Sequence, residues 1–117
     1  MRKKLDYEYC SASPILEWLG DKWALVVLLK LHENGVIRFN ELYKVIPSIS
    51  EKMLSTVLHS LVTDGLVCRK IYPSVPPKVE YYVSEFGETL IPHLEHLKQW
   101  GQENFETIMD NRRKNKY

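Results

Sequence analysis

The sequence lacks the features that mark secreted and membrane proteins. Its two cysteines, Cys10 and Cys68, are too few for a disulfide framework and suit a reducing compartment. Its longest apolar run, residues 23–29, is far shorter than the roughly 20 residues that cross a bilayer. The basic start Met-Arg-Lys-Lys is followed by no apolar segment, so we expect no signal peptide, no membrane partner and a cytoplasmic protein.

Catalytic and cofactor motifs are also missing. The chain has no Gly-rich phosphate loop, no nucleophile elbow and no recognisable spacing of acid, base and nucleophile. We therefore expect no enzyme and no cofactor. His93 and His96 lie three residues apart on a predicted helix, but two imidazoles are too few for a metal site unless His32 or a partner subunit contributes. We predict no metal site, and a metal sensor remains an alternative.

Neither sign of charge is in excess overall, but the charged residues are unevenly distributed along the chain. The formal net charge is only +1, yet residues 84–110 carry six acids and one lysine. An acidic C-terminal helix can conceal a basic face elsewhere, so near-neutrality does not exclude a nucleic-acid partner. The length suits one domain, which we assign to residues 1–111. We expect the basic tail, residues 112–117, to be disordered.

Apolar spacing and capping residues predict a mainly helical chain. The expected helices span residues 14–19, 22–33, 41–46, 51–64 and 85–111. Their predicted N-caps are Ser13, Asp21, Asn40, Ser50 and Ser84. Gly65 ends the fourth helix, and Pro92 predicts a kink inside the last one.

Strands rich in Val, Ile and Tyr interrupt the helices. A very short strand is expected over residues 36–38, and a hairpin over residues 66–72 and 79–84. The hairpin loop, residues 73–78, contains three prolines and ends in a lysine, so it is stiff and basic. The element order predicts an α+β, mainly α fold: a winged helix-turn-helix with a two-stranded wing and a long C-terminal dimerisation helix.

The fourth helix is the candidate recognition helix. One face is apolar, through Ile49, Met53, Leu54, Val57, Leu58 and Leu61. On the other face, Ser55, Thr56 and His59 can reach base edges in a major groove. Lys52 and the Ser50 cap can contact phosphates. The alternative is a solvated surface helix.

The hairpin is the candidate wing. Its predicted DNA-contacting residues are Arg69, Lys70, Pro76, Pro77 and Lys78. A loop stiffened by proline loses little entropy on entering a minor groove. The alternative is a solubilising hairpin that protects a sheet edge. Arg38, just before the helix-turn-helix, is predicted either to clamp a phosphate or to form a salt bridge with Glu41.

The last helix offers more apolar surface than one small domain readily covers, which indicates an interface. The predicted dimer-interface residues are Leu90, Ile91, Leu94, Leu97, Trp100 and Phe105. Packing on its own core is the competing interpretation. A two-fold dimer would place two recognition helices about 34 Å apart, one turn of DNA.

Several short motifs together resemble the HxlR-type family of winged helix-turn-helix regulators, within the MarR-like superfamily. They are Gly20-Asp-Lys-Trp23, Arg38-Phe-Asn-Glu-Leu42, Ile46-Pro-Ser-Ile-Ser50, Asp64-Gly-Leu-Val67 and Val75-Pro-Pro-Lys-Val-Glu-Tyr81, with Trp100-Gly101. The resemblance covers roughly residues 10–101. It implies a homodimeric bacterial transcription regulator that binds a near-palindromic operator in double-stranded DNA.

The resemblance also implies a role for Cys10. Family members often carry a cysteine thirteen residues before the tryptophan of the Gly-x-Lys-Trp motif, and in some members this cysteine senses electrophiles or oxidants. Cys10 stands at that distance from Trp23, but Ser11 replaces the proline that usually follows. We predict a redox or small-molecule effector acting at Cys10. A winged-helix module that binds protein through its last helix, without specific DNA binding, is the alternative function.

Overall fold

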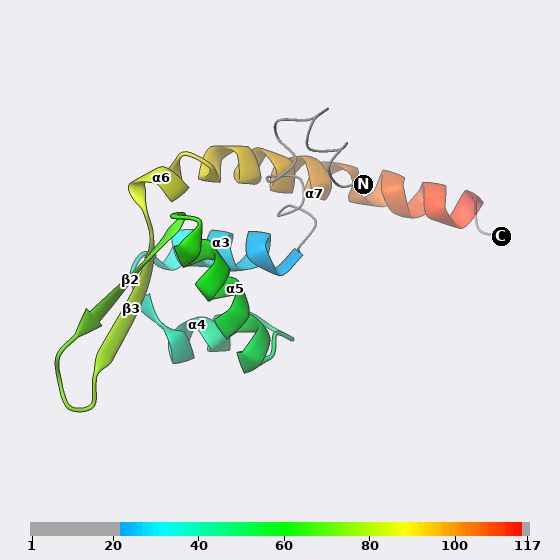
Figure 1. The fold of residues 1–117 in the computed structure, drawn as a ribbon. Helices are drawn as coiled ribbons and strands as arrows, with labels where there is room; N and C mark the ends of the chain where they lie inside the picture. The colour runs from blue at the N-terminus through cyan, green and yellow to red at the C-terminus, as the bar shows by residue number, and fades with distance from the viewer. Residues whose placement is uncertain (1–21, 116–117) are drawn as a thin grey trace, which may run out of the picture.

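The computed structural model describes residues 22–115. In chain order, its elements are α3 (Lys22–Asn34), β1 (Ile37–Arg38), α4 (Phe39–Val45), α5 (Glu51–Thr63), β2 (Val67–Tyr72), β3 (Lys78–Val83), α6 (Glu85–Glu88) and α7 (Ile91–Lys114) (Figure 1). The helix predicted over residues 14–19 and the caps Ser13 and Asp21 lie outside the described residues.

Helix α3 forms the centre of the core, as its apolar sequence predicts. Its buried residues are Ala24, Val27, Leu28 and Leu31. The helix contacts α5, β3 and α7, so it joins the helix-turn-helix to the sheet and to the last helix.

Helix α4 begins two residues earlier than predicted. Its N-cap is Arg38, not Asn40, and the Arg38 main-chain N–H donates to Glu41 Oε1 at 3.2 Å. The prediction was wrong because β1 runs directly into the helix, so Arg38 becomes the capping residue and Glu41, the third helical residue, accepts from the N–H of that cap. The turn that follows places Ile46 and Ile49 in the core, so α4 and α5 form a packed helix-turn-helix.

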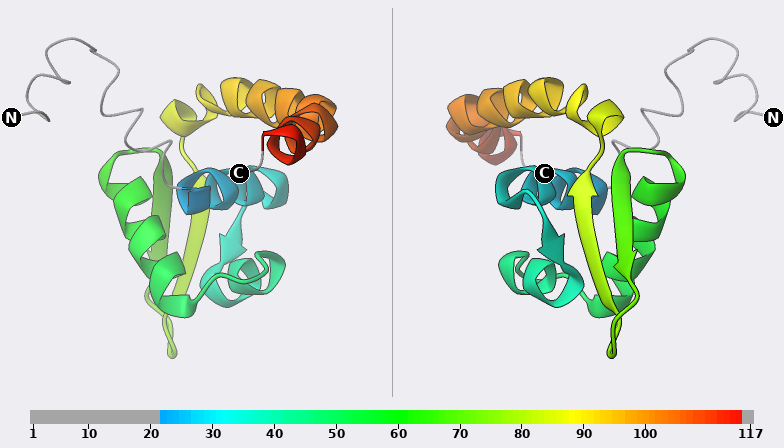
Figure 2. Two further views of the ribbon diagram at one scale, coloured as in Figure 1. Left: turned by 90° about the vertical axis from the view of Figure 1, so that its right-hand side faces the viewer. Right: turned by 90° about the vertical axis from the view of Figure 1, so that its left-hand side faces the viewer.

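The sheet has three antiparallel strands in the order β1-β3-β2. The hairpin pairs Val67 with Val83 at its base and Tyr72 with Lys78 near its tip. Strand boundaries agree with the prediction to within one residue, and β1 adds a third strand beside β3. Figure 2 shows the hairpin tip projecting beyond the helices, at the end of the molecule away from α7.

The junction after β3 differs from the single kinked helix that the sequence predicts. Ser84 caps as expected, since its Oγ accepts from the Gly87 N–H at 2.9 Å. However, the capped helix α6 ends at Glu88, and Pro92 lies in the first turn of α7. A proline there removes no helical hydrogen bond, so the predicted kink is replaced by a break.

Helix α7 is 24 residues long and crosses the end of the molecule opposite the wing (Figures 1 and 2). Its last turn includes Arg112, Arg113 and Lys114, so the prediction that these residues are disordered was wrong. Basic side chains favour the C-terminal end of a helix because they complement its dipole. The predicted fold class, an α+β and mainly α winged helix-turn-helix, is confirmed.

Candidate nucleic-acid interface

Helix α5 is bounded by the signals that its sequence contains. The Ser50 Oγ accepts a hydrogen bond from the Met53 N–H at 3.0 Å, which caps the first turn. Gly65 follows the helix with a φ of +80°, a conformation that glycine adopts without steric cost. Both the predicted cap and the predicted stop are confirmed.

The buried stripe of α5 is narrower than predicted. Its buried residues are Leu54, Val57, Leu58 and Leu61. Met53 was expected in this stripe but is 40% exposed, so that prediction was wrong. Met53 lies in the first turn, at the edge of the stripe, where apolar spacing alone does not show how far the core extends.

The opposite face of α5 presents a row of short polar side chains. Lys52, Ser55, Thr56 and His59 are all exposed, at the helical spacings that bring them to one side. The Thr56 hydroxyl donates to the Lys52 carbonyl at 2.9 Å, which leaves its oxygen free to accept. Within residues 22–115, Ser55 and His59 have no hydrogen-bond partner, so both remain available to a ligand.

Neighbouring basic residues of the wing face opposite ways. Arg69 pairs across the strands with Tyr81, whereas Lys70 pairs with Glu80. Successive residues in a strand point to opposite faces, so Arg69 and Tyr81 share the face turned toward α5. Lys70 and Glu80 share the outer face.

The outer face of the wing is a cluster of charges around one ring. The ammonium groups of Lys70 and Lys78 each lie 5.0 Å from the centre of the Tyr72 ring. Lys78 Nζ also lies 3.4 Å from Glu80 Oε2. The hydrogen bond from Tyr72 does most to hold the pKa of Glu80 below its usual value, against desolvation; Lys78 lowers it further.

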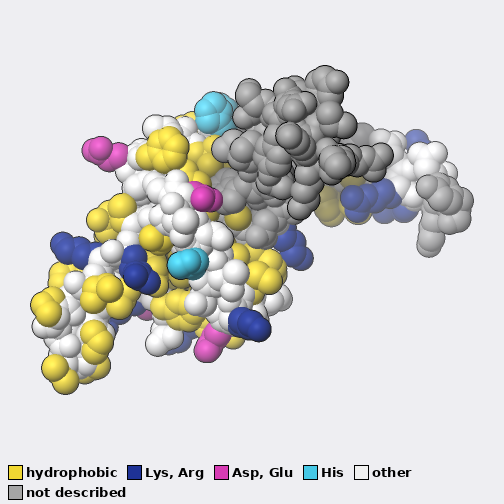
Figure 3. Space-filling view, in the orientation of Figure 1, with side chains coloured by type: hydrophobic (Ala, Val, Ile, Leu, Met, Phe, Trp, Pro, Cys, Tyr) yellow, Lys and Arg dark blue, Asp and Glu magenta, His cyan; other side chains and the backbone are white. Residues whose placement is uncertain are grey.

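The wing tip is apolar, not basic as expected. Lys78 is part of β3, and the projecting loop consists of Pro73, Ser74, Val75, Pro76 and Pro77. The Ser74 hydroxyl donates to the Pro76 carbonyl at 2.8 Å, which holds the loop closed. Figure 3 shows hydrophobic side chains gathered at the tip, with Lys and Arg nearer its base.

Arg38 does not form the predicted salt bridge with Glu41 among the described residues. The Glu41 carboxylate accepts from the Arg38 main chain, and the described residues contain no ion pair between the two side chains. Arg38 instead lies directly opposite Glu80 across β1 and β3. Its contribution to phosphate binding stays a prediction.

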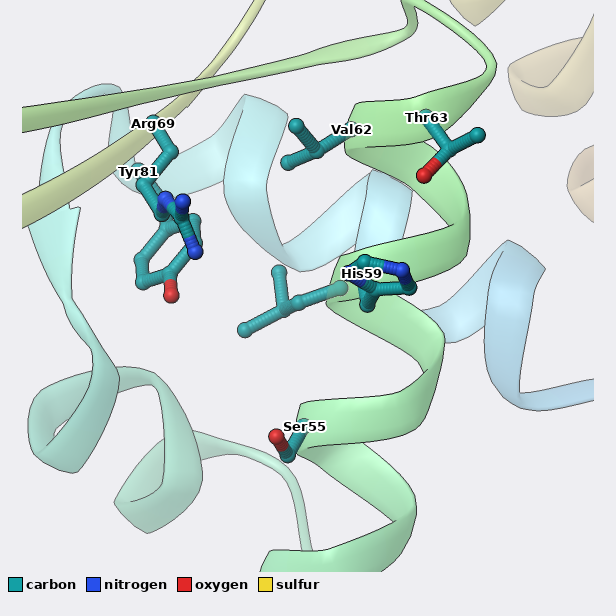
Figure 4. A pocket seen from close by; sticks show the side chains of 7 residues that line it. Ser55, His59, Val62, Thr63, Arg69 and Tyr81 are labelled. Carbon is teal, nitrogen blue, oxygen red and sulfur yellow. The ribbon is translucent and has the colours of Figure 1, made fainter.

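A small pocket separates the recognition helix from the wing. Its volume is about 180 Å³, and its floor is formed by Leu58 and Val62. Its polar rim combines three side chains from α5 with two from the hairpin: Ser55, His59, Thr63, Arg69 and Tyr81. Figure 4 shows Arg69 and Tyr81 on one side of the pocket and the α5 residues along the other.

The apolar residues of α7 divide into two groups. Ile91 and Leu94 are buried in the core of the protomer, and Leu90 packs against it. The prediction that these residues form a dimer interface was wrong for Ile91 and Leu94, because the domain covers them itself. Leu97, Trp100 and Phe105 are 51%, 57% and 58% exposed. A dimer interface formed by these three exposed residues stays a prediction.

Cys10, the possible metal ligands and the possible membrane spans are the remaining features that the sequence analysis considered. Cys10 lies outside the described residues. Over residues 22–115, no three His, Cys, Asp or Glu side chains are grouped to hold a metal ion. His32 Nδ1 instead lies 3.0 Å from Glu88 Oε2, which links α3 to α6. None of the described helices is long and apolar enough to span a membrane.

Sequence reasoning missed three residues of this surface: Tyr72, Glu80 and Tyr81. Each lies in a predicted strand, and the alternation of strand residues would have placed Tyr81 with Arg69. The signal was therefore present, but it needed the register of the hairpin.

Comparison with known proteins gives a consistent result. A family model described as HxlR-like helix-turn-helix matches residues 18–109. YdeP of Bacillus subtilis, an HTH-type transcriptional regulator, is 43% identical over 103 residues, 88% of this chain and 80% of YdeP. The redox regulator HypR in its oxidised form is 41% identical with a TM-score of 0.73, over 81% of this chain and 97% of HypR. The reduced transcriptional regulator YodB of B. subtilis is 30% identical with a TM-score of 0.70, over 80% of this chain and 90% of YodB.

Proposed function

Because the chain belongs to the HxlR-like helix-turn-helix family of transcriptional regulators, which are not enzymes, we propose that it is a homodimer that binds a specific, near-palindromic DNA operator. The observation that carries the proposal is the polar face of α5, which lies beside a hairpin that projects past the helices. We place the protein in the bacterial cytoplasm, where an operator is accessible.

The recognition helix α5 enters the major groove and the wing lies along the adjacent minor groove. The Ser55 hydroxyl can donate to or accept from a base edge, and the Thr56 hydroxyl, which donates to the Lys52 carbonyl, can accept from one. Lys52 supplies a positive charge for a phosphate at the start of the helix. The apolar tip at Val75 meets the sugar and base edges of the minor groove, where apolar side chains of other DNA-binding proteins also make contact.

Dimerisation places two such units on one DNA. Leu97, Trp100 and Phe105 form an exposed apolar face on α7, the helix farthest from the wing tip. A second copy of α7 would cover this face without obstructing α5 or the hairpin. Two-fold symmetry then sets the half-sites about one helical turn apart.

Selection from a random DNA pool tests this function. Full-length protein under reducing conditions should enrich a near-palindrome whose half-sites lie about 10 base pairs apart, centre to centre. Ser55→Ala should relax the preference at one position of each half-site, whereas Lys52→Ala should weaken all sequences alike. If the dimer enriches no sequence, a protein-interaction module becomes the better description.

We also propose that Cys10 makes this binding responsive to oxidants or electrophiles. The support is the position of Cys10 before Trp23, and the likeness to HypR, which is a redox regulator. Adding diamide to the protein–operator complex should change the affinity of the wild type and of Cys68→Ser, but not of Cys10→Ser. An equal response from Cys10→Ser would remove the role of Cys10.

A further inference from the structure

The pocket between α5 and the wing is a candidate binding site for a small group. We propose that it seats one DNA phosphodiester, which His59 and Arg69 hold from opposite sides. The proposal rests on the function proposed above and assigns His59 to the sugar-phosphate backbone rather than to a base edge. The site thereby fixes how far the wing contact lies from the recognition-helix contact.

The chemistry of the rim suits a phosphate. It offers one guanidinium, one imidazole and three hydroxyl groups, and no acidic side chain. Across the described residues, Arg69 has no ion pair and no hydrogen bond, unlike Lys78, which is paired with Glu80. A guanidinium can donate two parallel hydrogen bonds to a phosphate, which gives both affinity and a fixed orientation.

The size of the pocket favours a small anionic group over an organic effector. About 180 Å³ is well below the roughly 300–1,000 Å³ of pockets that bury drug-sized ligands. Its apolar floor, Leu58 and Val62, belongs to α5 and gives a rigid base to the site. A phosphodiester needs only its two unesterified oxygens to be enclosed.

The position of the pocket between α5 and the hairpin indicates that the phosphate belongs to the DNA backbone. The major and minor grooves are separated by one sugar-phosphate strand, so a protein that fills both must let that strand pass between its two contacting elements. Here the two elements are α5 and the β2–β3 hairpin, and the pocket is the hollow between them (Figure 4). A two-fold dimer would use the same phosphate once in each half-site.

Methylphosphonate scanning of the selected operator tests the proposal. Each phosphate is replaced in turn by an uncharged methylphosphonate, and the affinity is measured by fluorescence anisotropy for full-length wild type, Arg69→Gln and Lys70→Gln. Lys70 is the matched control, since it is adjacent, basic and exposed but faces the other way. At one phosphate per half-site, wild type and Lys70→Gln should lose roughly tenfold in affinity, and Arg69→Gln no more than about twofold.

The outcomes separate this inference from the function on which it rests. Specific binding with equal losses for Arg69→Gln and Lys70→Gln at every phosphate would overturn the pocket and leave the regulator standing. Failure to select any sequence would overturn both. If Arg69→Gln does not fold, His59→Asn provides the same comparison, with the exposed Ser60→Ala as its control; unchanged losses for His59→Asn would then contradict the proposal.

Discussion

Lys70 and Glu80 are direct partners across the two strands of the wing, and the same carboxylate lies 3.4 Å from the Lys78 ammonium. Glu80 therefore offsets part of the positive charge that the wing offers to DNA. We predict that Glu80→Gln binds non-specific duplex DNA a few-fold more tightly, with a salt slope steeper by up to about one unit. Anisotropy titrations between low and physiological salt measure both quantities.

Glu85→Gln is the matched control for this prediction. Glu85 is an exposed acid in α6, which follows the end of β3 remote from the wing tip. Its removal should leave the non-specific affinity nearly unchanged. Equal gains for the two variants would show that only net charge matters, and not the position of Glu80 in the wing.

The same carboxylate predicts a pH dependence of stability. Tyr72 and then Lys78 keep the pKa of Glu80 below its ordinary value in the folded protein. The ionised form therefore stabilises the fold above the ordinary pKa, and this contribution is lost as the pH falls through the folded-state pKa. The thermal unfolding temperature should fall less steeply between neutral and acid pH for Glu80→Gln than for wild type. Identical curves of unfolding temperature against pH would contradict this.

Val75 predicts a loss of affinity that salt does not affect. It is fully exposed at the apolar wing tip, so an apolar contact with DNA would bury it without displacing counterions. Val75→Ser should weaken operator binding by about fivefold at every salt concentration. Arg69→Gln should instead reduce the salt slope by about one. A changed slope for Val75→Ser would count against a purely apolar contact.

Phe105 predicts how the dimer depends on α7. It is 58% exposed on the same helix as Leu97 and Trp100. Phe105→Lys should raise the dimer dissociation constant by at least about tenfold, because a charge replaces an aromatic side chain that the proposed dimer buries. Gln99→Lys, on the polar face where Gln99 bonds to Glu103, should not. Sedimentation equilibrium distinguishes these results, and an unchanged dimer in both would place the interface elsewhere.

Gly87 predicts a large effect on stability from one methyl group. A Cβ at this position would overlap the carbonyl oxygen of Leu66 and lie 2.7 Å from Val83 Cγ1. Gly87→Ala should therefore lower the free energy of unfolding by about 1–3 kcal/mol, measured by urea denaturation. Glu85→Ala in the same short helix should change it by less than about 0.5 kcal/mol. Similar effects would mean that α6 moves away from Leu66 and Val83 at little cost.

Local signals predicted most of the elements because each depends on neighbouring residues. Ser50, Gly65 and Ser84 act on the helix next to them, and the hairpin follows from two runs of strand-forming residues. Pro92 signalled an interruption of the last helix, but neighbouring residues do not decide between a kink in one helix and the end of α6 followed by the start of α7.

The candidate site was predicted in its residues but not in its arrangement. The apolar stripe of the last helix does not reveal that Leu94 is buried in the core while Leu97 is exposed. Likewise, the basic residues of the hairpin were identified, but their register decides that Arg69 faces α5 and Lys70 does not. Tertiary packing sets both distinctions.

The specificity ratio of the full-length protein tests the central claim most directly. It compares the dissociation constant for the selected operator with that for a duplex of the same length and composition in scrambled order, at physiological salt. A sequence-specific regulator should bind its operator at least about 10³-fold more tightly. A ratio near one, with the protein folded and dimeric, would contradict the assignment of α5 as a recognition helix.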